Sequence, residues 1–123
     1  MIGYITLGTN DVERSASFYD QLLLADDVKQ LRPNDRVVLW ARKGAPMFGI
    51  SKPFDGEPAT SGNGTMIALN VESTDEVHKI YDKALEIGGT DEGEPGPRGT
   101  TGFYGGYFRD LDGNKLAVFT RVK

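Results

Sequence analysis

The sequence predicts an α+β fold of two βαβββ modules, whose strands form a curved mixed sheet with a cup on one side. Three observations support this fold. Apolar residues follow strand and helix periods in a fixed order, that order occurs twice, and one constant spacing relates the two copies. The 123 residues have the size of a single domain. We expect module one at about residues 1–54, a linker at about 55–64 and module two at about 65–123.

Module one is expected to contain a strand, an amphipathic helix and three further strands. Asn10 is the expected helix cap, and apolar residues from Val12 to Leu23 recur at helical spacing. A stretch rich in Pro, Gly, Ser and Thr follows the last strand and predicts the linker. The expected strands cover residues 4–9, 28–31, 36–41 and 47–50, and the helix ends at Leu24.

Module two repeats the same order. Ser73 and Glu76 match a capping box, in which two side chains bond the free backbone amides at the start of a helix. Gly88-Gly89 predicts the end of that helix, and Asp112-Gly113 predicts a hairpin turn. The Gly/Pro-rich residues 90–102 are expected to form a loop with one short strand. The clear strands are expected at residues 66–71, 104–109 and 115–121.

One spacing of 62 residues relates the two modules. It separates Ile5 from Ile67 in the first strand of each module, and Tyr19 from Tyr81 in each helix. The alternative is a chance similarity between two amphipathic helices that each follow a strand. Because the spacing is shared by a strand and a helix, we favour duplication of the whole unit.

The composition limits the chemistry and the partners. Lys and Arg number 14 against 18 Asp and Glu, and this net charge of −4 gives no support for nucleic-acid binding. No apolar run approaches the ~20 residues that span a bilayer, and the first residues lack a signal-peptide pattern. We therefore expect a cytoplasmic protein with no nucleic-acid or membrane partner. Cysteine is absent and His78 is the only histidine, so thiolate sites and Ser-His-Asp triads are not expected.

Three segments carry a resemblance to a known family. Residues 7–15 run into Phe18-Tyr19, residues 107–114 contain the turn Asp-Leu-Asp-Gly-Asn, and residues 88–98 are rich in Gly, Pro and acidic side chains. With the repeated βαβββ order, they make the chain resemble the vicinal oxygen chelate superfamily, which includes glyoxalase I, bleomycin-resistance proteins and extradiol dioxygenases. Leu111 stands where the turn of that family usually has proline. The resemblance covers nearly the whole chain and implies the paired-module fold and a homodimer.

The same resemblance implies where a metal would bind. The four ligand positions of the family correspond to Tyr4, Met66, Ala117 and a fourth-strand position near Phe48. None carries a good ligand for a divalent metal, since one tyrosine beside Met, Phe and Ala makes a poor site. We expect no metal and no cofactor, and metal-dependent glyoxalase I chemistry is disfavoured. His78 lies beside the apolar stripe of its helix and is expected at the surface.

The favoured function is that of a metal-free protein of the glyoxalase/bleomycin-resistance type, which binds a small, partly aromatic molecule in the cup. Strand alternation turns Tyr4 and Met66 away from the helices and toward that cup. A competing interpretation is that the same side chains fill the cup as core. The expected ligand-binding residues are Tyr4, Trp40, Phe48, Met66, Tyr107, Ala117 and Phe119.

Two other functions stay open. One is an enzyme of this superfamily, a lyase, isomerase or dioxygenase with an atypical site in which Tyr4 serves as general acid or base. The other is an interaction module whose cup is filled by its own side chains. Residues 93–99 are expected to form an ordinary surface loop, or alternatively a lid that brings Arg98 or Tyr104 to a ligand.

Overall fold

The computed structural model describes residues 1–123 and contains two compact units, Met1–Ser61 and Gly62–Lys123. Each unit is one βαβββ module, so the predicted α+β fold of two modules is confirmed. Neither helix is long and apolar enough to cross a bilayer. Module one contains β1 (Tyr4–Gly8), α1 (Val12–Leu22), β2 (Lys29–Leu31), β3 (Val37–Ala41) and β4 (Met47–Ser51). Module two contains β5 (Met66–Asn70), α2 (Thr74–Glu86), β6 (Thr90–Pro97), β7 (Phe103–Arg109) and β8 (Lys115–Arg121).

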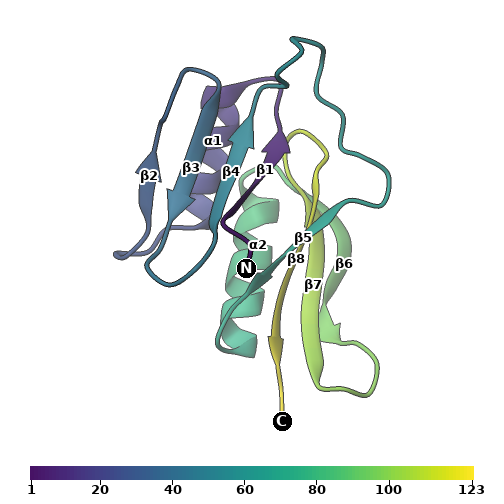
Figure 1. Ribbon diagram of the computed structural model, residues 1–123. Coiled ribbons are helices and arrows are strands. Elements are labelled where there is room, and N and C mark those ends of the chain that lie inside the picture. The colour runs from purple at the N-terminus through teal and green to yellow at the C-terminus, as the bar shows by residue number, and fades with distance from the viewer. The chain divides into compact units, whose positions relative to one another are not determined.

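Both sheets have the same topology. The strand order is β1-β4-β3-β2 in module one and β5-β8-β7-β6 in module two, and each helix covers one face of its own sheet (Figure 1). The first strand of each module runs parallel to the last one, and the other pairs are antiparallel. Equivalent pairs also keep their register, because Tyr4 pairs with Met47 and Met66 pairs with Lys115. The shared register extends the sequence repeat to the hydrogen-bonded sheet.

The core of module one contains a cluster of aromatic rings. α1 buries Phe18 and Tyr19. The centre of the Tyr19 ring lies 4.7 Å from the ring centre of Phe48 and 5.7 Å from that of Trp40. Full burial of a large apolar side chain contributes about 1.5–3 kcal/mol. The rings of Tyr19, Trp40 and Phe48 therefore supply a large share of the free energy that holds α1 on its sheet.

The core of module two is mainly aliphatic. Val77 and Ala84 of α2 have no exposed surface, and α2 lies against β6, β7 and β8. Leu116 and Val118 of β8 are equally buried, and Phe108 is the fully buried aromatic ring of this core. The two helices therefore dock on their sheets through side chains of different shape.

Helix α1 begins one residue later than expected. Its cap is Asp11, whose Oδ1 accepts a hydrogen bond from the backbone N–H of Arg14 at 3.1 Å. The side-chain oxygen of Asn10 instead accepts from the N–H of Ala59 at 2.7 Å, which ties the linker to the start of the helix. The prediction that Asn10 caps the helix is therefore wrong. Asp11 stands 62 residues before Ser73, the cap of α2, so the true caps follow the repeat.

Residues 90–97 form a long strand, where the composition predicts a loop with one short strand. β6 pairs with β7 through two register shifts, between Asp91 and Gly93 and between Gly93 and Gly96. Gly93 has a φ of 151°, which side-chain-bearing residues rarely adopt, so glycine permits this bulge. β6 is also an edge strand, where proline is tolerated because one side of the strand needs no partner.

Candidate functional site

Each sheet has a second face, on the side away from its helix, which we call the open face of that module. Paired residues of neighbouring strands point to the same face, so the register assigns the side chains. The open face of module one comprises Tyr4, Thr6, Val37, Leu39, Met47, Gly49 and Ser51. The open face of module two comprises Met66, Ala68, Asn70, Phe103, Gly105, Tyr107, Arg109, Lys115, Ala117 and Phe119.

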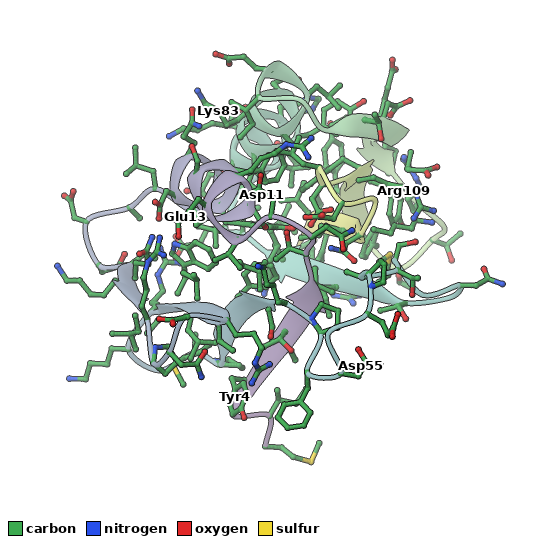
Figure 2. The ribbon with its side chains drawn as sticks, turned by 90° about the horizontal axis from the view of Figure 1, so that it is seen from above. Tyr4, Asp11, Glu13, Asp55, Lys83 and Arg109 are labelled. Atoms are coloured by element: carbon green, nitrogen blue, oxygen red, sulfur yellow. The ribbon has the colours of Figure 1, made fainter.

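Five of the seven predicted ligand-binding residues lie on an open face. Tyr4 exposes 62% of its surface and Met66 42%, and they hold equivalent positions at the starts of β1 and β5. Figure 2 shows Tyr4 on the side of β1 away from α1. Tyr107 and Phe119 are half-buried, whereas Ala117 is fully buried. The four larger side chains are therefore the ones that retain surface for a ligand.

Trp40 and Phe48 lie on the helix side of module one, so their predicted place in the cup is wrong. Trp40 Nε1 donates a hydrogen bond to Asp20 Oδ1 on α1 at 2.9 Å, and both rings contact Tyr19. The register agrees, because Trp40 pairs with Phe48, and Phe48 pairs with the helix-facing Ile5. A molecule on the open face would have the sheet between itself and these two rings.

The register also identifies the fourth-strand position that the sequence places only near Phe48. Ala117 pairs with the third residue of β5, and Gly49 pairs with the third residue of β1. Gly49 of β4 is therefore the equivalent of Ala117 of β8. The four positions that correspond to the family's metal ligands are Tyr4, Gly49, Met66 and Ala117.

These four positions do not fit a divalent metal. Met, Gly and Ala side chains supply no oxygen or nitrogen donor, which leaves one phenol. A side chain at Gly49 also lacks room, because its Cβ would contact the Leu39 side chain and lie 2.9 Å from the carbonyl oxygen of Val38. No group of three or more His, Cys, Asp or Glu side chains is placed to hold a metal ion. β1 and β4 also carry no carboxylate or imidazole that could act with Tyr4 as an acid–base pair.

Cations and aromatic rings gather on the open face of module two. The guanidinium of Arg98 and the ammonium of Lys115 each lie 5.5 Å from the centre of the Tyr107 ring. Phe103 and Phe119 stack with their ring centres 5.0 Å apart and their planes at 10°. An aromatic face attracts cations, and stacked rings present flat apolar surface. We call these five residues the aromatic–cationic cluster.

Arg98 and Tyr104, the two residues of which the alternative lid would bring one to a ligand, lie on opposite faces. Arg98 lies against Tyr107 on the open face. The Tyr104 hydroxyl forms a hydrogen bond of 2.6 Å with Nε2 of His78 on α2, so Tyr104 lies on the helix side. Lys115 was missed by the sequence analysis, although alternation from Ala117 along β8 would have placed it on the open face.

Acidic groups of β6 act on the helix side of module two. The Tyr81 hydroxyl of α2 donates to Asp91 Oδ1 at 2.6 Å. Burial, this hydrogen bond and the negative charges of Asp91 and Glu94 raise the pKa of Tyr81 to about 12. Hydrogen bonds from Tyr81 and from the Gly93 N–H in turn lower the pKa of Asp91. Asp91 thus places a negative charge beside α2, while Arg98 and Lys115 lie on the open face.

Comparisons with solved structures match this architecture. A glyoxalase/bleomycin resistance protein from Albidiferax ferrireducens is 34% identical, with a TM-score of 0.87 over 99% of both chains. A hypothetical protein from S. aureus is 28% identical, with a TM-score of 0.74 over 95% of this chain and 91% of that one. A fosfomycin resistance protein from Listeria monocytogenes shares the fold at 16% identity, with a TM-score of 0.73 over 99% and 93% of the two chains.

The family comparison covers almost the whole sequence. The model of the Glyoxalase/Bleomycin resistance protein/Dioxygenase superfamily matches residues 1–118. A search of curated proteins found no significant match. The matched residues include both modules and the four positions that correspond to metal ligands, Tyr4, Gly49, Met66 and Ala117. On the family match and the 34% identity of one relative, the chain belongs to the glyoxalase/bleomycin resistance protein/dioxygenase superfamily.

Proposed function

We propose that this protein binds a small, partly aromatic molecule on its open faces, without the help of a metal. The observation that carries the proposal is the aromatic–cationic cluster of module two. Its stacked pair, Phe103 and Phe119, and its Tyr107 ring are all half-buried, on a face that no helix of that module covers. Flat aromatic surface with a few polar groups is typical of small-molecule sites.

The residues at the family's ligand positions support the metal-free part of the proposal. Tyr4, Gly49, Met66 and Ala117 offer one oxygen among them, and the backbone around Gly49 resists a larger side chain. Glyoxalase I chemistry needs a Lewis acid to stabilise an enediolate, and these residues do not form a site for one. Binding without turnover requires no such site.

The names of the relatives are compatible with a small-molecule ligand. The Albidiferax ferrireducens protein is described as a glyoxalase/bleomycin resistance protein, and the Listeria monocytogenes protein as a fosfomycin resistance protein. These names illustrate the range of functions on one fold, so the choice among them must rest on the site.

The proposal also includes a cytoplasmic location and a homodimer. The dimer would form through exposed strand edges, and sedimentation equilibrium of the purified protein measures it.

Isothermal titration with two probes tests the binding function. The probes are naphthalene carboxylate and its neutral counterpart, naphthalene carboxamide. We expect saturable binding of at least one probe, weakened roughly two- to tenfold in Phe119→Ala because a stacked aromatic contact is lost. Phe54→Ala is the matched control, since Phe54 is 89% exposed in the linker region and lies outside the cluster. If neither probe binds, or if both variants weaken binding equally, the proposal is wrong.

Elemental analysis of the purified protein tests the absence of a metal separately. We expect no stoichiometric divalent ion after purification without chelators. One tightly bound ion per chain would contradict the metal-free part of the proposal, whatever the titration shows.

A further inference from the structure

We infer that the ligand of module two is a planar aromatic anion, whose carboxylate or similar small anionic group is attracted by the positive charges of Arg98 and Lys115, which approach Tyr107 from the side of β6 and from β8. This inference deepens the proposed function and rests on it. The proposed function requires only a partly aromatic molecule. The positive charges of the aromatic–cationic cluster add that the ligand carries a negative charge.

Neither cation beside Tyr107 has an acidic partner. Arg98 and Lys115 take part in none of the ion pairs of the structure, whereas Arg109 on the same face is paired with Glu92. Both side chains are also partly buried, so water and salt screen their charges less than those of fully exposed residues. An anionic group beside Tyr107 would lie in the field of both positive charges.

Arg98 is held in position by neutral groups. Its Nη2 donates to the carbonyl oxygen of Glu94 at 2.5 Å, and its Nη1 donates to that of Pro97 at 3.3 Å. These carbonyls restrict the guanidinium without cancelling its charge, which lowers the entropy cost of using it for binding. The remaining N–H donors of the guanidinium are available for a planar anion such as a carboxylate.

The glycines of β6 make room for this arrangement. A Cβ at Gly96 would lie 3.1 Å from Arg98 Nη1, and a Cβ at Gly93 would lie 3.4 Å from Nη2 and 3.1 Å from the Tyr107 ring. The two distances of 3.1 Å are short for a carbon in van der Waals contact. The Gly/Pro-rich segment, whose composition predicts a loop with one short strand, therefore allows Arg98, which directly follows β6, to lie back across that strand against Tyr107.

The two naphthalene probes separate charge recognition from aromatic binding. We expect the carboxylate to bind about three- to tenfold more tightly than the carboxamide, the size expected of two partly exposed charge pairs. This preference should shrink in Lys115→Gln and in Arg98→Gln and disappear in the double variant. The carboxamide affinity should stay within about twofold in all three, and added salt should weaken only carboxylate binding.

Lys79→Gln is the matched control, because Lys79 is an exposed lysine on α2 of the same module. It removes one positive charge from the protein and should keep the full preference for carboxylate. Equal affinity of the two probes for the unmodified protein overturns the inference and leaves the binding function standing, as does a preference that survives in the double variant. Failure of both probes to bind overturns the proposed function and the inference together.

Discussion

The two modules share one backbone plan but place their aromatic residues differently. In module one the rings of Tyr19, Trp40 and Phe48 meet beneath α1 and form part of the core. In module two the core is mainly aliphatic, and Phe103 and Phe119 stack on the open face instead. The duplicated backbone therefore does not dictate which face of the sheet carries the aromatic surface.

A single pair of equivalent residues shows the same difference. Leu39 pairs with Gly49 in module one, and Tyr107 pairs with Ala117 in module two, at the same place in the sheet. Leu39 is 9% exposed and its side chain covers the glycine, whereas Tyr107 is half-buried and contacts two cations. Module one therefore uses this position for packing, while module two has a polar ring there that keeps part of its surface exposed.

The largest expected effect comes from removing a ring of the module one core. Phe48→Ala should lower the free energy of unfolding by about 3–5 kcal/mol, because it leaves a cavity beside Tyr19 and Trp40. Phe119→Ala removes the same atoms from the open face of module two and should cost less than about 2 kcal/mol, since that side chain is only half-buried. Urea unfolding followed by circular dichroism measures both changes. Equal losses would mean that the open face is as much a core as the helix side.

The sequence was sufficient for the fold but only partly for the site. Tyr4 and Met66 could be placed because β1 and β5 alternate between more and less buried positions, and the repeat links them. β3 and β4 have three consecutive buried residues each, so alternation carried no signal for Trp40 or Phe48. Only the pairing of these strands with β1 reveals which face they use. Arg98 could not be placed either, since bulges in the glycine-rich β6 break the period of a strand.

A smaller effect is expected from adding a side chain at the fourth metal-ligand position. Gly49→Ala should destabilise module one by roughly 1–3 kcal/mol, because its Cβ would meet Leu39 and lie 2.9 Å from the Val38 carbonyl oxygen. Gly3→Ala is the control, since a Cβ there has no neighbour within 4 Å. Thermal unfolding of the two variants gives the comparison. A neutral Gly49→Ala would show that the sheet can accept a larger side chain, and would reopen this position to a metal ligand.

The smallest expected effect is a change in the pH dependence of stability, and it distinguishes the two equivalent helix tyrosines. Tyr81 of module two donates to Asp91, whereas Tyr19 of module one lies among aromatic rings. The hydrogen bond lowers the pKa of Asp91 below its usual 3.8. The contribution of the ionised Asp91 to the stability of the fold is therefore present above pH 3.8 and is lost as the pH falls below it. The raised pKa of Tyr81 makes its contribution complete below pH 10.0, and this contribution is lost as the pH rises toward about 12.

Tyr81→Phe should therefore be less stable than the unmodified protein mainly between about pH 4 and pH 10, and the two stability curves should converge at both ends. Chemical unfolding at a series of pH values measures this difference. Tyr4→Phe removes a hydroxyl from an exposed tyrosine and should leave the curve unchanged. A constant gap between Tyr81→Phe and the unmodified protein at all pH values would assign the loss to packing. Convergence only at high pH would show that the hydrogen bond does not depend on the charge of Asp91.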